Sequence, residues 1–185
     1  MRVPVALFIV CAVLGCGVPP AEETFSLAEE AQHKAESELG ISAQIQDSLF
    51  MVAIGHYESL VADHPDHELA EPSLFRVAEL HNNGTRRFQS AIDTYRRFLL
   101  QYPESPRAPV SLFMIGFLYN NELGDVESAG ASYREFLERY PDHELAASAS
   151  GELDNLGRSP EEIIARQTAM HQQGSTPAES GQPGP

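Results

Sequence analysis

Histidine and carboxylate side chains gather at two points of the chain, where residues of these types could bind a metal ion. His64-Pro65-Asp66-His67-Glu68 is the densest group, and Asp142-His143-Glu144 repeats part of it. Two histidine ligands on one helix face are commonly spaced His-x-x-x-His, and the sequence contains no such pair. Asp directly after a proline suits a helix N-cap, and Glu suits the first helical turn. We therefore interpret both groups as turn formers, and we expect no metal site and no cofactor.

The sequence also lacks a recognisable set of catalytic residues. It has no Ser–His–Asp arrangement, no glycine-rich phosphate loop and no dinucleotide motif. Its two cysteines are Cys11 and Cys16, and Cys11 lies in a segment that we expect to be removed. The mature chain would then have no second thiol for a disulfide or for nucleophilic catalysis. We therefore expect no catalytic residues and a non-enzymatic protein.

The N-terminus has the pattern of an export signal. Arg2 supplies a positive charge, and an almost uninterrupted apolar run follows from Val3 to Leu14. This run is far shorter than the roughly 20 residues that a membrane-spanning helix needs. A short apolar segment after a positive start is typical of a secretory signal.

The end of this run resembles a lipidation motif. Val13-Leu14-Gly15-Cys16 is similar to the lipobox of bacterial lipoproteins, in which the cysteine receives the lipid. The resemblance implies a signal peptide over residues 1–15, lipidation of Cys16 and a position in the bacterial cell envelope, facing the periplasm. Gly17 after the cysteine fits sorting to the outer membrane. The alternative is ordinary secretory cleavage nearby, with Cys16 unmodified.

Acidic residues dominate the charge of the chain. The 12 Lys and Arg residues face 27 Asp and Glu residues, so the formal charge is −15. A surface of this sign repels nucleic-acid phosphates and anionic lipid headgroups. We therefore expect no nucleic-acid partner, membrane contact through the lipid anchor only, and a basic or neutral protein partner.

Five arginines nevertheless gather in the middle of the chain. They are Arg86, Arg87, Arg96, Arg97 and Arg107. One reading is a patch for an acidic partner. The other is a solvated helix face on which Asp93 pairs with Arg96 and Arg97, and such exposed pairs carry little energy.

Three stretches of sequence align with one another at a spacing of 38 residues, and this is the strongest signal in the chain. Tyr57, Tyr95 and Tyr133 mark the spacing, and a proline follows 8 residues after each tyrosine. Around each tyrosine the apolar residues step by +3, +1, +3, +3, +1 and +3, which places them on one helix face. A second helical pattern follows each proline. The sequence therefore predicts two-helix hairpins that bury their apolar faces by stacking on their neighbours.

These residues resemble the tetratricopeptide repeat. The family's order of large, aliphatic, small, aromatic, alanine, aromatic, apolar and proline positions is followed by Leu112, Ile115, Gly116, Tyr119, Ala129, Tyr133, Phe136 and Pro141. One residue is inserted between Gly116 and Ala129. The resemblance implies an all-α fold, a right-handed superhelix (α-solenoid) of about three antiparallel hairpins over residues 25–172.

The segments Tyr95–Pro103 and Phe136–Pro141 are similar to repeats of two envelope families, the outer-membrane barrel-assembly lipoproteins and the Tol–Pal-associated periplasmic proteins. The resemblance implies a scaffold that binds other envelope proteins or an extended peptide, in outer-membrane protein assembly or the organisation of envelope complexes. Two alternatives remain open. The protein could be a structural element that self-associates through its repeat ends, or an accessory subunit of a cell-wall enzyme.

In tetratricopeptide proteins the first helix of each hairpin lines a concave surface. The resemblance places a candidate peptide groove on the residues Phe75, Glu79, Asn82, Val110, Phe113, Phe117, Asn120 and Asn155. Asparagine amides would bond to the peptide backbone, and Phe117, which lies off the repeated core series, would contact a side chain. Phe75 and Phe113 suit the core equally well.

The two ends of the chain are expected to lie outside the stack. Residues 16–24 would form a lipid-anchored tether, and residues 173–185, rich in Gly, Pro, Ser and Gln, would form a disordered tail. Ser26 with Glu29 predicts a capping box that opens a weakly packed cap helix, and Ser159 with Glu162 predicts another at the C-terminal end.

Overall fold

The computed structural model describes residues 17–37 and 42–174. The expected signal peptide, the lipidation residue Cys16 and residues 175–185 of the expected tail lie outside this part of the chain. Within it all regular elements are helices, and no helix is both long and apolar enough to cross a membrane. The described chain is thus all-α, as the repeat pattern predicts.

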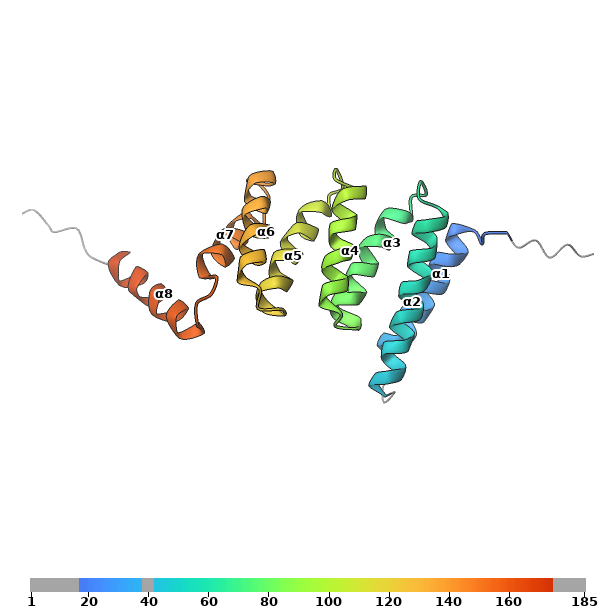
Figure 1. The fold of residues 1–185 in the computed structure, drawn as a ribbon, viewed down its shortest axis with the longest axis horizontal. Coiled ribbons are helices and arrows are strands. Elements are labelled where there is room, and N and C mark those ends of the chain that lie inside the picture. The colour runs from blue at the N-terminus through green and yellow to red at the C-terminus, as the bar shows by residue number, and fades with distance from the viewer. Residues whose placement is uncertain (1–16, 38–41, 175–185) are drawn as a thin grey trace, which may run out of the picture.

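The helices follow one another as antiparallel pairs that stack side by side (Figure 1). In chain order they are α1 Ala21–Ser37, α2 Ala43–Asp63, α3 Ala70–Glu79, a short π-helix η1 Leu80–Gly84, α4 Phe88–Gln101, α5 Ala108–Asn121, α6 Val126–Arg139, α7 Ala146–Asn155 and α8 Pro160–Gly174. The hairpins are α1–α2, α3–α4 and α5–α6, and α7 packs on α6. The predicted α-solenoid of about three hairpins is confirmed.

The tyrosines that mark the 38-residue spacing lie in the core. Tyr57, Tyr95 and Tyr133 are at most 2% exposed. Each ring packs against a phenylalanine from the first helix of its own hairpin, at centroid distances of 5.6, 5.8 and 5.6 Å. The alanines at the equivalent position of α2, α4 and α6 are fully buried. Small and large residues therefore alternate across each hairpin and fill its interface.

A widened turn at the end of α3 and of α5 absorbs the residue that is inserted relative to the tetratricopeptide pattern. The Thr85 N–H donates to the Leu80 carbonyl at 2.9 Å, and the Leu123 N–H donates to the Leu118 carbonyl at 3.1 Å. These bonds span five residues in place of the four of an α-helix, which is how a single inserted residue is accommodated. The faces of the preceding helix and of the following helix therefore keep their register.

The start of α1 differs from the expectation. The helix begins at Ala21, so four residues of the expected tether (21–24) are helical and Ser26 lies inside the helix. Its buried stripe consists of small residues such as Ala28 and Ala35, whereas Leu27 is 42% exposed. Alanines contribute little to a hydrophobic pattern, but their small side chains let two helices approach closely. α1 packs along α2 and is therefore the first helix of a full hairpin, not a cap.

The turns between hairpins use other residues than predicted. Asp66 and Asp142 do not cap helices, because α3 and α7 begin one turn later, after Leu69 and Leu145. Instead, the Nδ1 atoms of His67 and His143 accept a hydrogen bond from the backbone N–H of the residue two positions later, Leu69 and Leu145, each at 3.2 Å. Ser105, 38 residues from both, does the same for Arg107 at 3.0 Å through Oγ. The histidines are thus turn formers, although the predicted capping residue was wrong.

At the C-terminal end the predicted capping box is confirmed. The Ser159 N–H donates to Glu162 at 2.8 Å, and the Glu162 N–H donates to the Ser159 hydroxyl at 3.2 Å. The helix that it opens, α8, extends beyond α7 and away from the stack (Figure 1). It runs to Gly174, so the helix includes residues 173 and 174 of the expected tail.

Candidate binding groove

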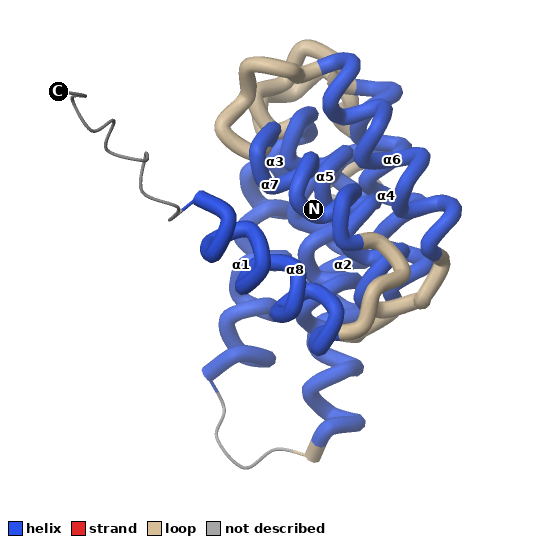
Figure 2. The backbone as a smooth tube through the Cα atoms, turned by 90° about the vertical axis from the view of Figure 1, so that its left-hand side faces the viewer, coloured by secondary structure: helices blue, strands red, loops and turns tan. Residues whose placement is uncertain are grey.

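The helices form two layers, which is what creates grooves between hairpins. Figure 2 looks along the stack and shows α3, α5 and α7 on one side and α4 and α6 on the other. Because each hairpin is offset from the next, the first helices of successive hairpins lie next to one another with a depression between them.

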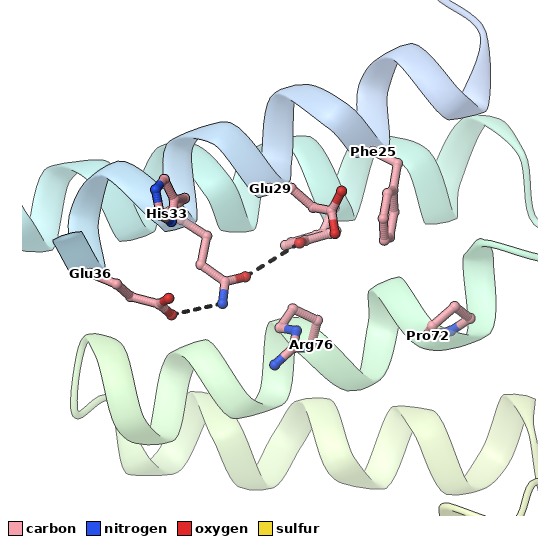
Figure 3. Close-up of a pocket in the computed structure, with 8 residues that line it drawn as sticks. Phe25, Glu29, His33, Glu36, Pro72 and Arg76 are labelled. Carbon is pink, nitrogen blue, oxygen red and sulfur yellow. Dashed lines mark hydrogen bonds between the residues drawn. The ribbon is translucent and has the colours of Figure 1, made fainter.

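The most enclosed depression of this layer lies between α1 and α3 (Figure 3). It has a volume of about 240 Å³, and the ring of Phe25 and the ring of Tyr57 form its apolar wall. A second hollow of about 230 Å³ continues it toward the other end of α3 and shares Gln32, Glu36 and Arg76 with it. Together the two hollows form one groove along the α1–α3 interface, which we call the inner groove.

Acidic and amide groups line the inner groove. Gln32 donates its amide N–H to Glu36 at 2.8 Å and accepts the Tyr57 hydroxyl at 3.3 Å (Figure 3). Glu29 and Glu36 are exposed. Arg76 is the one arginine among the residues that line the two hollows, and its charge is paired with Glu79 at 2.8 Å. The groove is therefore net negative along its length.

Burial shifts the pKa of the tyrosine in this wall. Desolvation raises the pKa of Tyr57 to about 12, against a weaker opposing effect of Arg76. The hydroxyl is protonated at physiological pH, as an exposed tyrosine would also be, and it donates its hydrogen to Gln32. This bond orients the amide, on either side of which Glu29 and Glu36 lie along α1, while Arg76 and Glu79 pair with each other on α3.

The groups described here suit non-covalent binding. Within residues 17–37 and 42–174, no cluster of three or more His, Cys, Asp and Glu side chains could hold a metal ion. The groove offers carboxylates for cationic side chains, aromatic rings for apolar ones and an amide between them.

Comparison with known proteins places the repeats in a family. Residues 73–105 and 110–143 each match the family profile described as tetratricopeptide repeat. These two segments are therefore similar to tetratricopeptide repeats. The two matched segments coincide with most of the α3–α4 and α5–α6 hairpins, and the α1–α2 hairpin lies outside them. Tetratricopeptide repeats typically form non-catalytic scaffolds for protein–protein interaction.

One solved structure can be aligned with most of the chain. The crystal structure of BtubC (BKLC) from P. vanneervenii aligns over 88% of this chain and 79% of that chain, with 17% sequence identity and a TM-score of 0.43. No curated protein sequence matches the chain.

Only part of the predicted groove lies in a hollow. Glu79 lines the inner groove, and Asn155 lines a separate hollow of about 180 Å³ between α7 and α8. Asn82, Val110, Phe117 and Asn120 are half-buried and lie outside the hollows described here. The eight predicted residues therefore do not form one site.

Phe75 and Phe113 pack against core side chains, which is the alternative that the sequence left open for them. The ring of Phe75 contacts the ring of Phe98 at 5.4 Å, and the ring of Phe113 contacts that of Phe136 at 6.0 Å. Both phenylalanines are half-buried against the core of their hairpins. Phe117 is not among the side chains that pack on that core, in agreement with its position off the repeated series.

The residues that the sequence reasoning missed are those of α1. Phe25, Glu29, Gln32 and Glu36 all line the inner groove. They are spaced by 4, 3 and 4 residues, which is one face of a helix. That face is detectable in the sequence, but the few apolar residues of this segment, Leu27, Ala31, Ala35 and Leu39, favour a weakly packed cap helix.

The central arginines connect neighbouring hairpins. Arg97 donates to Glu58 at 2.6 Å, and Arg107 donates to Glu71 at 2.7 Å. Asp93 accepts from Gln89, so its predicted pairing with Arg96 and Arg97 is wrong. The partners lie 36 to 39 residues away because the stack places equivalent positions of successive hairpins side by side. These charges are therefore mostly satisfied within the fold.

Proposed function

We propose that the protein is a lipid-anchored, non-enzymatic scaffold of the bacterial cell envelope that binds an extended segment of a partner protein in the inner groove. The observation that carries the proposal is the continuous, acidic groove between α1 and α3. Tetratricopeptide repeats in the same stack support a protein as the partner.

The lining of the groove favours a partner segment with Lys or Arg. Glu29 and Glu36 lie one turn and three turns along α1 from Phe25, so two cationic side chains can bind beyond an apolar one along the groove. A net charge of −15 attracts such a segment at a distance as well. Charge complementarity of this kind increases the association rate and selects among partners.

The position of the groove fits an anchor at Cys16. Residues 17–20 precede α1, and four extended residues span only about 14 Å. The His64 ring donates to the Pro19 carbonyl at 2.7 Å, and His67 contacts Glu22 at 3.2 Å, so this segment is held against the first hairpin. A lipid on Cys16 would therefore keep the inner groove close to the membrane, where envelope proteins expose segments next to their own anchors.

The anchor is tested by labelling cells with a fatty-acid analogue. The wild-type chain should incorporate the label, and Cys16→Ala should lose it and be released from the membrane fraction. Unchanged labelling of Cys16→Ala would refute the anchor without affecting the groove.

The groove is tested in two steps. Photocrosslinking in cells from position 32 and mass spectrometry identify the partner, whose binding to residues 17–185 is then measured by titration calorimetry. Glu29→Arg and Glu36→Arg should each weaken binding at least about tenfold. Glu30→Arg is the matched control, because Glu30 is exposed on α1 and does not line the groove. Equal losses in all three variants, or none, would exclude the inner groove.

A further inference from the structure

The opposite layer of the stack has a groove of its own, between α4 and α6, which we call the outer groove. It has a volume of about 380 Å³, and Leu112 and Ile115 of α5 form its floor. Leu100 stands at the rim and is 83% exposed. Arg96 and Arg139 border the same opening. Among the exposed large apolar side chains of the described residues, Leu100 has the highest exposed fraction.

The equivalent groove one hairpin earlier, between α2 and α4, is closed. Leu74 and Val77, which lie 38 residues before Leu112 and Ile115, are completely buried, and Leu112 and Ile115 are only 2% and 3% exposed, so the two interfaces differ at their rims and not at their floors. The Arg97–Glu58 ion pair spans α2 and α4 at 2.6 Å above Leu74 and Val77. Position 62, the equivalent of Leu100, is an alanine. The first interface is therefore filled by its own side chains.

The outer groove has the same two charges in exchanged positions, yet they do not meet. The position equivalent to Glu58 is occupied by Arg96, and the position equivalent to Arg97 is occupied by Glu135. Glu135 instead accepts from Arg139 of its own helix at 2.8 Å. The Arg96 guanidinium lies over the ring of Tyr119, with Cζ 5.5 Å from its centroid, and has no carboxylate partner among the described residues. The groove therefore remains open, with a cation available at its edge.

Helix α8 carries the complementary groups. It leaves the stack after α7, and Ile164 and Met170 are 63% and 55% exposed on it. Glu161 is exposed and precedes Ile164 by three residues, so both side chains lie on one face of the helix. Glu162 is occupied by the capping box with Ser159. A hydrogen bond from the backbone at the helix start and one from Ser159 lower the pKa of the exposed Glu161 carboxyl, which therefore carries a negative charge at this end of α8.

We propose that α8 of one copy docks in the outer groove of a second copy, where Ile164 packs against the exposed side chain of Leu100, and Glu161 pairs with Arg96. The contact joins two different surfaces, so it links copies head to tail or closes as a reciprocal exchange of α8. It uses the layer opposite the inner groove and is independent of the proposed function. A scaffold joined in this way presents several inner grooves together.

Sedimentation velocity of residues 17–185, from about 1 µM to about 0.5 mM, tests the proposal. This range of residues retains the complete core, which begins at Ala21. The wild-type chain should associate with increasing concentration. Leu100→Asp and Ile164→Asp should each weaken association at least tenfold, because each places a charge in the apolar contact. Leu27→Asp is the control, since Leu27 is also exposed but lies on α1. It should associate as the wild type does.

A charge exchange identifies the pair itself. Arg96→Glu and Glu161→Arg should each weaken association, and the double variant should restore it; circular dichroism should show the same helix content throughout. A monomer over the whole concentration range would overturn the proposal. Association that survives Leu100→Asp would also overturn it, because the contact would then lie elsewhere. Association that is weakened by Leu100→Asp but not by Ile164→Asp would overturn it as well, because another segment would then occupy the groove. Failure of the double variant to recover would likewise overturn it.

Discussion

Gly116 of α5 lies directly against the ring of Tyr133 in α6. A Cβ built on Gly116 would be 2.8 Å from Cε1 of that ring, which is closer than two carbon atoms can approach without a shift. Tyr133 is completely buried and also packs against Phe113. The small position of the tetratricopeptide pattern therefore has a direct physical reason in this hairpin, because the helix backbone itself forms one wall of the tyrosine pocket.

Gly116→Ala should destabilise the protein by about 1–3 kcal/mol, since a buried ring must move to admit the methyl group. Urea unfolding followed by circular dichroism measures the change. Gly55→Ala is the control, because Gly55 is a helical residue with no neighbouring atom within 4 Å of its added Cβ. This control should gain about 0.5–1 kcal/mol through helix propensity. Similar gains in both variants would contradict the close packing.

Phe113 and Phe117 should respond differently to truncation. Phe113→Ala should reduce the free energy of unfolding by about 2–4 kcal/mol, because its ring packs against Tyr133 and Phe136. Phe117→Ala should cost about 1 kcal/mol or less, since its ring lies outside the core contacts. The two variants lie on the same helix and remove the same atoms, so each is the control for the other. Comparable losses in urea unfolding would show that Phe117 belongs to the core.

Stability should decrease at alkaline pH because of the buried tyrosines. Burial holds the pKa of Tyr57 at about 12 in the folded protein, against about 10 in the unfolded chain. Between these values the unfolded state binds fewer protons than the folded state, so the free energy of unfolding falls as pH rises. The contribution is complete below pH 10 and is lost through pH 12. Urea unfolding at a series of pH values measures this change. Between pH 9 and 11, Tyr57→Phe should make the free energy of unfolding fall less steeply with pH than in the wild type. An unchanged slope would contradict it.

His143 should be replaceable by serine but not by alanine. Its ring accepts the Leu145 N–H, and Ser105 performs the same task with its hydroxyl in the preceding turn. His143→Ala should therefore cost about 1 kcal/mol, the net value of a lost hydrogen bond. His143→Ser should keep most of that stability, as measured by thermal unfolding. Equal losses would mean that the ring contributes through its contact with Phe136.

Helical periodicity was sufficient to predict the solenoid. The series around Tyr57, Tyr95 and Tyr133 combined a fixed spacing with a one-sided apolar pattern, and these two requirements leave few alternatives to stacked hairpins. The cap at Ser159 was predictable for a similar reason, because it depends only on two residues three positions apart.

The inner groove was not predictable in the same way. Its lining depends on α1, whose buried stripe of Ala28 and Ala35 contributes little to any hydrophobic pattern. The ion pairs between hairpins were missed because local spacing favours Asp93, whereas Arg97 reaches Glu58 only once the hairpins have stacked. Contacts between residues about 38 positions apart depend on the three-dimensional offset of the repeats.

The widened turns at Leu80–Thr85 and Leu118–Leu123 have a consequence for how such a chain can change over time. An added or lost residue is accommodated locally, at the place where one helix ends, and the rotation of the helices on either side is preserved. Repeat length and surface chemistry can therefore diverge separately, so that descendants of one ancestral hairpin can acquire new partners without having to rebuild the interior that supports them.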